Sequence, residues 1–168
     1  MIIIVEGISR VGKTTLCNKL KTKFNIPIYK HNIKLIDYNK MCDNIEVEKM
    51  LCMLDMYKTI PSNIIFDRFH FSNTVYGILL RNYDKQSAFN NINKIESYIK
   101  QLGIKCLLLK VSPNNIEESS KQYGKDLKPF ENLMVELYDN SILDKYNCDY
   151  NTEDELIKKL EKIINTKE

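Results

Sequence analysis

The sequence is poor in several residue types, and the shortages exclude whole classes of protein. Its 168 residues include one alanine, three arginines, two histidines and no tryptophan. The longest aliphatic runs, Ile2–Val5 and Leu107–Leu109, are far too short to cross a membrane, so we expect no membrane-spanning segment. No charged and apolar leader precedes the first run, so secretion is not indicated and we expect a cytoplasmic protein.

Cysteine and histidine are too scattered to predict a metal centre. The five cysteines lie at positions 17, 42, 52, 106 and 148, without any C-x-x-C pair, and the histidines are His31 and His70. A structural zinc site needs four such ligands at close spacing. We therefore predict reduced thiols and no zinc.

The balance of charge is mild. The formal net charge is +3, and lysines are spread along the whole chain without forming a basic track, so we do not expect nucleic acid as a partner. Lysine supplies nearly all of the positive charge. Each of the three arginines, Arg10, Arg68 and Arg81, therefore raises the question of what a lysine could not do at that position.

Short apolar runs alternate with helical patterns along the chain. This order predicts an α/β protein of one domain, 1–168, with a parallel five-stranded sheet and helices on both faces. The expected strands span 2–5, 26–29, 64–66, 106–111 and 148–150, and the expected helices span 13–24, 46–59, 71–83, 88–102, 113–122, 130–146 and 152–165.

A phosphate-binding signature lies between the first strand and the first helix. Residues 7–14, Gly-Ile-Ser-Arg-Val-Gly-Lys-Thr, match G-x-x-x-x-G-K-[ST]. The glycines let successive backbone N–H groups face phosphate oxygens, Lys13 can reach the β- and γ-phosphates, and Thr14 can bind Mg²⁺. A GTPase is disfavoured, because no aspartate lies three residues before any glycine. We predict that ATP and Mg²⁺ are bound here by Gly7, Ser9, Arg10, Val11, Gly12, Lys13, Thr14 and Thr15.

A second polar segment, residues 67–72 (Asp-Arg-Phe-His-Phe-Ser), directly follows the third predicted strand. Ligands of open α/β sheets bind at the carboxyl ends of the strands. We therefore expect Asp67 and Arg68 to face the same cleft as the phosphate loop.

With residues 5–15 (VEGISRVGKTT), residues 67–72 (DRFHFS) and the following Val75-Tyr76, the chain resembles the thymidylate kinase family, in a compact form with short loops. The resemblance implies a P-loop NTPase fold, a homodimer, and phosphoryl transfer from Mg·ATP to a deoxynucleoside monophosphate, with thymidylate as the preferred acceptor. It implies catalytic roles for Lys13, Arg10, Arg68 and Asp67, with Mg²⁺ held by Thr14 and Asp67. It also implies an acceptor site formed by Ser9, Lys30, Arg68, Phe69, Ser72 and Tyr76.

The resemblance also bears on the source of the catalytic arginine. One branch of the family carries an arginine in the phosphate loop and none in the lid. Arg10 matches the first feature, and the lid candidate, about 113–128, contains no arginine. Two departures leave the base preference open: Ser9 replaces an aspartate of the family loop, and the helix 46–59 lacks the arginine that reads thymine.

A deoxynucleoside kinase is the alternative, since it shares the fold and the phosphate loop. Its 5′-hydroxyl acceptor needs a general base, which that family places as a glutamate after the second strand. Here Tyr29-Lys30-His31-Asn32 stands at that position, and Asp67-Arg68-Phe69 replaces the family's E-R-S. Both features favour a monophosphate acceptor, although Asp67 can still act as a base. A polynucleotide-end kinase and a non-catalytic nucleotide-binding protein are further alternatives.

Overall fold

The computed structural model describes residues 1–30, 43–59, 62–149 and 151–165. Its sheet has five parallel strands in the order β2-β3-β1-β4-β5, which confirms the α/β class and the sheet predicted from the sequence. The strands are β1 (Ile2–Glu6), β2 (Ile28–Lys30), β3 (Ile64–Asp67), β4 (Cys106–Val111) and β5 (Asp144–Cys148). The helices are α1 (Lys13–Phe24), α2 (Asp43–Thr59), α3 (His70–Arg81), α4 (Lys85–Gln101), α5 (Ile116–Tyr123), α6 (Lys128–Asn140) and α7 (Glu153–Asn165).

The central strand β1 separates two apolar cores. Successive side chains of a strand point to opposite faces, so Ile2 and Ile4 enter one core while Ile3 and Val5 enter the other. All four are fully buried. A strand covered on both faces must be continuously apolar, which is why this short run lacks the alternation of a half-exposed strand.

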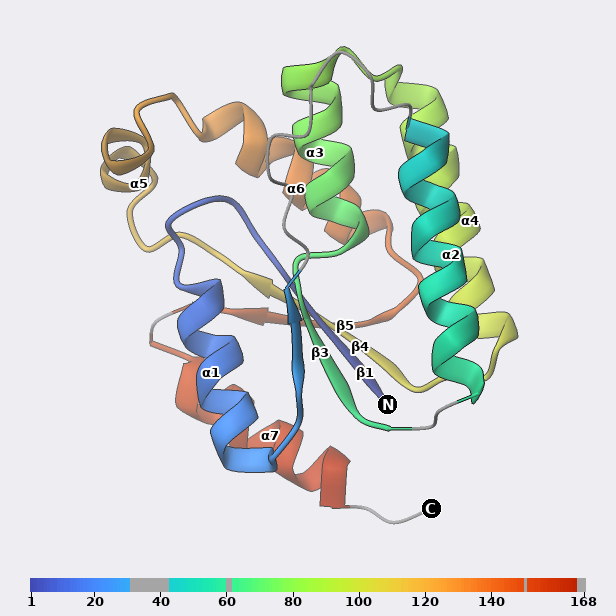
Figure 1. The fold of residues 1–168 in the computed structure, drawn as a ribbon. Helices are drawn as coiled ribbons and strands as arrows, with labels where there is room; N and C mark the ends of the chain where they lie inside the picture. The colour runs from blue at the N-terminus through green and yellow to red at the C-terminus, as the bar shows by residue number, and fades with distance from the viewer. Residues whose placement is uncertain (31–42, 60–61, 150, 166–168) are drawn as a thin grey trace.

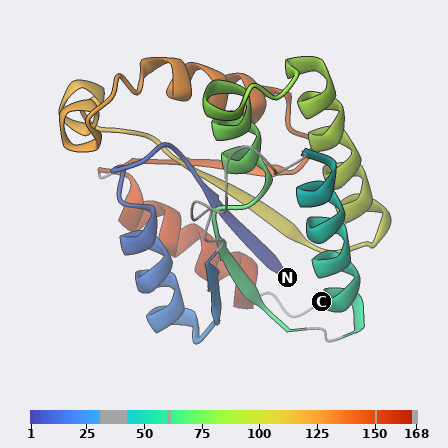
Figure 2. The same ribbon diagram turned by 45° about the horizontal axis from the view of Figure 1, so that its top comes forward.

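The helices form a layer on each face of the sheet. Helices α1 and α7 cover one face, and α2, α3, α4 and α6 cover the other (Figures 1 and 2). The short helix α5 lies apart from both layers, on the side of the loop that joins β1 to α1 (Figure 1). The connection that leaves β1 carries α1 on one face of the sheet, whereas the connections that leave its neighbours β3 and β4 carry α3 and α6 on the other face. Open α/β sheets bind ligands at the carboxyl ends of the strands beside such a change of face.

Two elements in the last third of the chain differ from those predicted from the sequence. The helix predicted over 130–146 begins at Lys128 and ends at Asn140, and the fifth strand spans Asp144–Cys148 instead of 148–150. Long-range contacts explain the early end: Ser141 Oγ and the Ile142 N–H both donate to Glu96 of α4, at 2.7 and 2.9 Å. These bonds turn the chain out of the helix, and no local pattern announces them.

The lid candidate contains a helix that begins later than predicted. Helix α5 starts at Ile116 and not at Pro113, because the Asn115 side chain accepts hydrogen bonds from the N–H groups of Glu117 and Glu118. No helix in the described part of the chain is long and apolar enough to span a membrane.

Candidate functional site

The loop between β1 and α1 has a backbone conformation that requires glycine at two positions. Gly7 has φ +145°, and a Cβ at this position would lie 2.4 Å from the carbonyl oxygen of Val111 on the neighbouring strand. Gly12 precedes α1 with φ +90°, a conformation that side chains disfavour. The first turn of α1 therefore opens directly onto the loop, with its free N–H groups and its positive dipole end available to an anion.

Lys13 is folded back into this loop. Its side chain is 5% exposed, and Nζ donates a hydrogen bond to the carbonyl oxygen of Ile8. Burial, together with the charge of Arg68, lowers the pKa of Lys13 to about 7, against the opposite influence of Glu6 and Asp67. A bound polyphosphate would place negative charge beside Lys13 and so favour its protonated form.

Thr14, Asp67 and Lys30 meet beside the loop. The Thr14 hydroxyl donates to Asp67 Oδ2 at 2.9 Å, and Lys30 Nζ lies 4.0 Å from the same oxygen. Asp67 ends β3 and is 2% exposed, so the fold holds its carboxylate in place. One hydroxyl and one carboxylate are the oxygen donors that Mg²⁺ prefers, and their contact fits the predicted metal-binding pair.

Arg68 follows β3 with φ +74°, and its half-buried guanidinium spans the gap between the loop and α3. Its Nη1 group donates to Ser72 Oγ and its Nη2 group donates to Ser9 Oγ, both at 3.3 Å. The guanidinium carbon also lies 5.4 Å from the centre of the Tyr76 ring. These contacts hold a bidentate cation at the mouth of the site.

Tyr76 ties the phosphate loop to α3. Its hydroxyl lies 2.7 Å from Ser9 Oγ and accepts a hydrogen bond from the Ser9 N–H at 3.1 Å. Tyr76 comes 67 residues after Ser9, so this is a tertiary contact. The loop conformation thus depends on the helix that follows Arg68.

Arg10 stands at the tip of the loop and between two cavities. It is exposed and has φ +67°, an uncommon conformation for a residue with a side chain. One cavity, of about 430 Å³, is lined by Ser9, Arg10, Gly12, Lys13, Thr14, Thr15, Lys30, Asp67, Arg68 and Tyr123. The other, of about 370 Å³, runs from Arg10, Val11, Gly12 and Thr15 past α5 towards α7.

The structure brings together most of the residues that the sequence predicts for the site. Four cations and one carboxylate line the first cavity: Arg10, Lys13, Lys30, Arg68 and Asp67. Three predicted acceptor residues lie behind Arg68 instead. Phe69 is fully buried and stacks on Phe66, Ser72 is fully buried, and Tyr76 is 8% exposed.

The lid candidate contributes from both sides of α5. Tyr123 lines the first cavity, and Glu118, Ser119 and Gln122 line the second. Lys121 and Lys125 are exposed, and neither is among the residues that line these two cavities. Asp149, which follows the last strand, also lines the second cavity, whereas Tyr150 and His31 lie outside the described residues.

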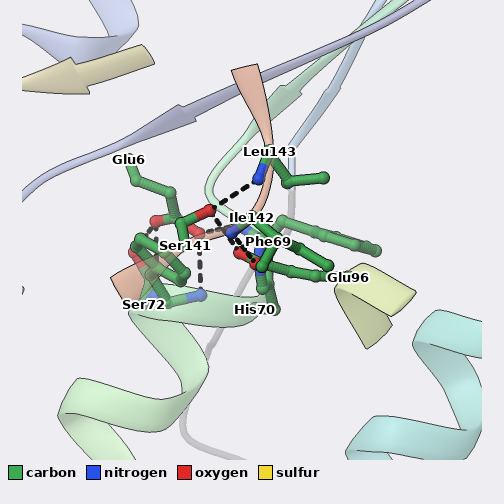
Figure 3. A network of polar contacts seen from close by, with 9 residues as sticks. Glu6, Phe69, His70, Ser72, Glu96, Ser141, Ile142 and Leu143 are labelled. Atoms are coloured by element: carbon green, nitrogen blue, oxygen red, sulfur yellow. Dashed lines mark hydrogen bonds and ion pairs between the residues drawn. The ribbon is translucent and has the colours of Figure 1, made fainter. Parts of the chain in front are cut away.

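Glu6 is a residue of the site that the sequence reasoning did not assign. It is the last residue of β1, directly before Gly7, and it is fully buried. Its carboxylate accepts hydrogen bonds from the N–H groups of Phe69 and Phe71 at 2.8 and 3.0 Å, and from the N–H and hydroxyl of Ser72 (Figure 3). The available signal was an ionisable residue at the end of an aliphatic strand, since a buried charge must find several partners.

Comparison with known proteins shows which solved structures share this fold. No protein-family model and no curated protein matches the sequence. The YorR protein of Bacillus subtilis, solved in complex with phosphorylated GDP, is similar over 98% of this chain and 95% of its own, with TM-score 0.73 and 23% identity. Deoxyadenosine kinase from M. mycoides is similar over 99% and 100% (TM-score 0.61, 16% identity), and thymidylate kinase from Candida albicans over 98% and 91% (0.57, 19%).

These likenesses span nearly the whole chain. The protein therefore has the fold shared by P-loop nucleoside and nucleotide kinases. Polyphosphate kinase 2 from Arthrobacter aurescens, with TM-score 0.65 and 11% identity, has the same core, and this chain covers 68% of its length. At such identities the shared feature is the architecture, and the reaction has to be argued from the site.

Proposed function

We propose that the protein is a kinase that transfers the γ-phosphoryl group of Mg·ATP to the 5′-phosphate of a deoxynucleoside monophosphate, with thymidylate as the preferred acceptor. The P–O bond to ADP breaks, and a new P–O bond forms to an oxygen of the acceptor phosphate. The observation that carries the proposal is the first cavity, in which four cations surround one carboxylate. That excess of positive charge suits two phosphate-bearing substrates held end to end.

Each side chain has a distinct task in this proposal. Lys13 and the loop N–H groups bind the ATP phosphates, and Arg68 grips the acceptor phosphate with both of its Nη groups. Thr14 and Asp67 would hold Mg²⁺, which when bound neutralises charge on the ATP phosphates. Arg10, at the tip of the loop, stabilises charge on the phosphoryl group in transit. Catalysis is then positioning and charge neutralisation, because an acceptor phosphate needs no strong base.

Lys30 supports a monophosphate over a nucleoside. It occupies the end of β2, where a deoxynucleoside kinase would need a carboxylate base, and its ammonium lines the same cavity as Arg68. The alternative acceptor, a nucleoside 5′-hydroxyl, is favoured by the likeness to deoxyadenosine kinase and by the position of Asp67. In that reaction Asp67 would have to accept the hydroxyl proton.

The test is ADP release from Mg·ATP, measured against a panel of nucleosides and nucleoside monophosphates. We expect turnover with one or more monophosphates, and a loss of about 100-fold or more in kcat/KM for the acceptor in Arg68→Ala. Arg81→Ala is the matched control: it removes the same charge from the far end of α3, and Arg81 lines neither of the two cavities. Turnover on nucleosides alone would reject the monophosphate acceptor, and no turnover on any small acceptor would reject the proposed function.

A further inference from the structure

We propose that Glu6 is a positioning residue for Arg68 and acts through the hydroxyl of Ser72. The proposal assigns a role to a buried carboxylate that does not line either cavity of the site. It rests on the proposed function, because it concerns how the acceptor-binding arginine is aimed.

The first step is the chemistry of the buried charge. Glu6 is fully buried at the end of β1, and among the described residues no cation lies within 4.0 Å of its carboxylate. Four hydrogen bonds are its direct contacts, three of them from backbone N–H groups in the first turn of α3 or just before it, and the charge of Lys13 acts on it from a longer distance. These donors have no partner inside the helix, and the positive end of the helix dipole adds to their effect. The carboxylate therefore fixes the start of α3 against β1.

The second step concerns the hydroxyl proton of Ser72 and the atom to which it is donated. The Ser72 hydroxyl donates to Glu6 Oε2 and accepts a hydrogen bond from Arg68 Nη1. A hydroxyl has a single proton, so the bond to Glu6 turns the lone pairs of the oxygen towards the guanidinium. Without the carboxylate, the hydroxyl could donate to a backbone carbonyl of its own helix, as serine commonly does.

The third step is the local backbone. All three backbone donors to Glu6 lie within four residues after Arg68, and Arg68 itself holds the uncommon φ of +74°. Such a conformation persists only where the surrounding structure over-determines it. Glu6 holds the backbone that follows Arg68. The backbone of Arg68 itself is held by its N–H group, which donates to the Val5 carbonyl at 3.0 Å. Both anchors belong to β1, which also carries the phosphate loop.

The molecule contains its own control for this arrangement. Glu96 is likewise a buried glutamate, 1% exposed, and it accepts from the Ser141 hydroxyl and the Ile142 N–H (Figure 3). It also contacts His70 Nε2 at 3.1 Å, so it braces the same end of α3. Within the part of the chain that the structure describes, no hydrogen bond joins Glu96 to Ser72 or to Arg68. Replacing Ser141 or Glu96 thus reproduces the packing loss without altering the relay to Arg68.

The first experiment measures kinetics on Glu6→Gln and Ser72→Ala, with Glu96→Gln and Ser141→Ala as matched controls. Ser72→Ala should raise KM for the acceptor about tenfold and leave KM for ATP within about twofold, because the lost hydroxyl contacts Arg68 and Glu6 and neither of these is assigned to the ATP phosphates. Glu6→Gln should lower kcat/KM for the acceptor about 100-fold, since misplacing a positioning group by about 1 Å has effects of that size. In the Arg68→Ala background, both changes should have little further effect. Equal, additive losses with and without Arg68 would show that Glu6 is only structural.

The second experiment does not require turnover. The chain has three arginines, so the ¹⁵N side-chain signals of Arg68 can be assigned by comparison with Arg68→Ala. The hydrogen bonds that both Nη groups donate should slow rotation about the Cζ–Nε bond of Arg68 in the wild type. We expect faster rotation in Ser72→Ala and Glu6→Gln and no change in Ser141→Ala and Glu96→Gln. Unchanged Arg68 signals in folded Glu6→Gln and Ser72→Ala would overturn the inference even if the proposed kinase activity is found, and absence of all activity with the expected signals would reject only the proposed function.

Discussion

The hydroxyl of Thr14 and the carboxylate of Asp67 form a 2.9 Å hydrogen bond across 53 residues of sequence. This contact joins the first turn of α1 to the end of β3, and so joins the two motifs that the sequence presents separately. Both groups offer hard oxygen ligands to a divalent cation at the same point.

Asp67→Asn should therefore impair the response to Mg²⁺. The substitution keeps the size of the side chain and removes its charge, so we expect a loss of about 10- to 100-fold in activity, with half-saturation at a higher Mg²⁺ concentration. The measurement is a Mg²⁺ titration of ADP release. Asp139→Asn, on an exposed part of α6, is the control for charge removal. An unchanged Mg²⁺ dependence in Asp67→Asn would contradict the predicted metal ligand.

The lowered pKa of Lys13 leads us to expect that the protein takes up protons when it binds a nucleotide. Its pKa in the nucleotide-free protein is lowered to about 7, so at pH 8 most molecules carry a neutral Lys13. Bound phosphates favour the charged form and raise this pKa, so binding at pH 8 should draw in a large fraction of one proton, and binding at pH 6 should draw in much less.

Calorimetric titration with ADP in buffers of different ionisation enthalpy measures this uptake. Lys13→Arg is the control, because a guanidinium stays protonated at both pH values and leaves only the proton exchange of the nucleotide phosphates, which is subtracted from that of the wild type. After this subtraction, equal proton uptake at pH 6 and pH 8 would refute the lowered pKa.

Replacing Arg10 by glycine should make the protein more stable and the reaction slower. Its φ of +67° is unfavourable for a residue with a Cβ, so Arg10→Gly should raise the free energy of unfolding by about 1 kcal/mol. The same change removes the proposed transition-state cation, and kcat should fall by about 1000-fold. Denaturant unfolding and ADP release measure the two effects.

Asn82→Gly is the matched control for this prediction. Asn82 has φ +55° at the end of α3, away from the residues that line the two cavities. Asparagine tolerates this conformation better than arginine, so a smaller gain in stability is expected, without a change in rate. A lower stability of Arg10→Gly would mean that the arginine side chain stabilises the loop by more than the backbone costs.

Replacing tyrosine by phenylalanine should have different effects on stability at Tyr76 and at Tyr83. Tyr76→Phe removes the acceptor of the Ser9 N–H and should cost about 1 kcal/mol of stability. The Tyr83 hydroxyl oxygen is buried and has no hydrogen-bond partner within the described residues, so Tyr83→Phe should be neutral or stabilising. Chemical denaturation of both variants tests this pair, and a similar loss in each would show that the Ser9 contact adds nothing specific.

Part of the candidate site was open to prediction because its signals are local. The signature in residues 7–14 and the strand that precedes it lie next to each other in the chain, and the structure has the predicted strand, loop and helix. The position of Asp67 and Arg68 followed from a rule about parallel sheets, and both line the cavity beside the loop. The placement of Phe69 was not accessible in this way, because its burial depends on packing against Phe66 and the rest of the core.

The alternation of strands and helices, the phosphate loop and its positively charged residues could all be derived from the amino-acid sequence. Each of these depends on residues a few positions apart, and hydrophobic periodicity and glycine conformation act at that range. The end of α6 and the groups that surround Arg68 depend instead on contacts between distant parts of the chain. Glu96 meets Ser141 across 45 residues and Glu6 meets Ser72 across 66, because a buried carboxylate must find donors wherever the fold brings them.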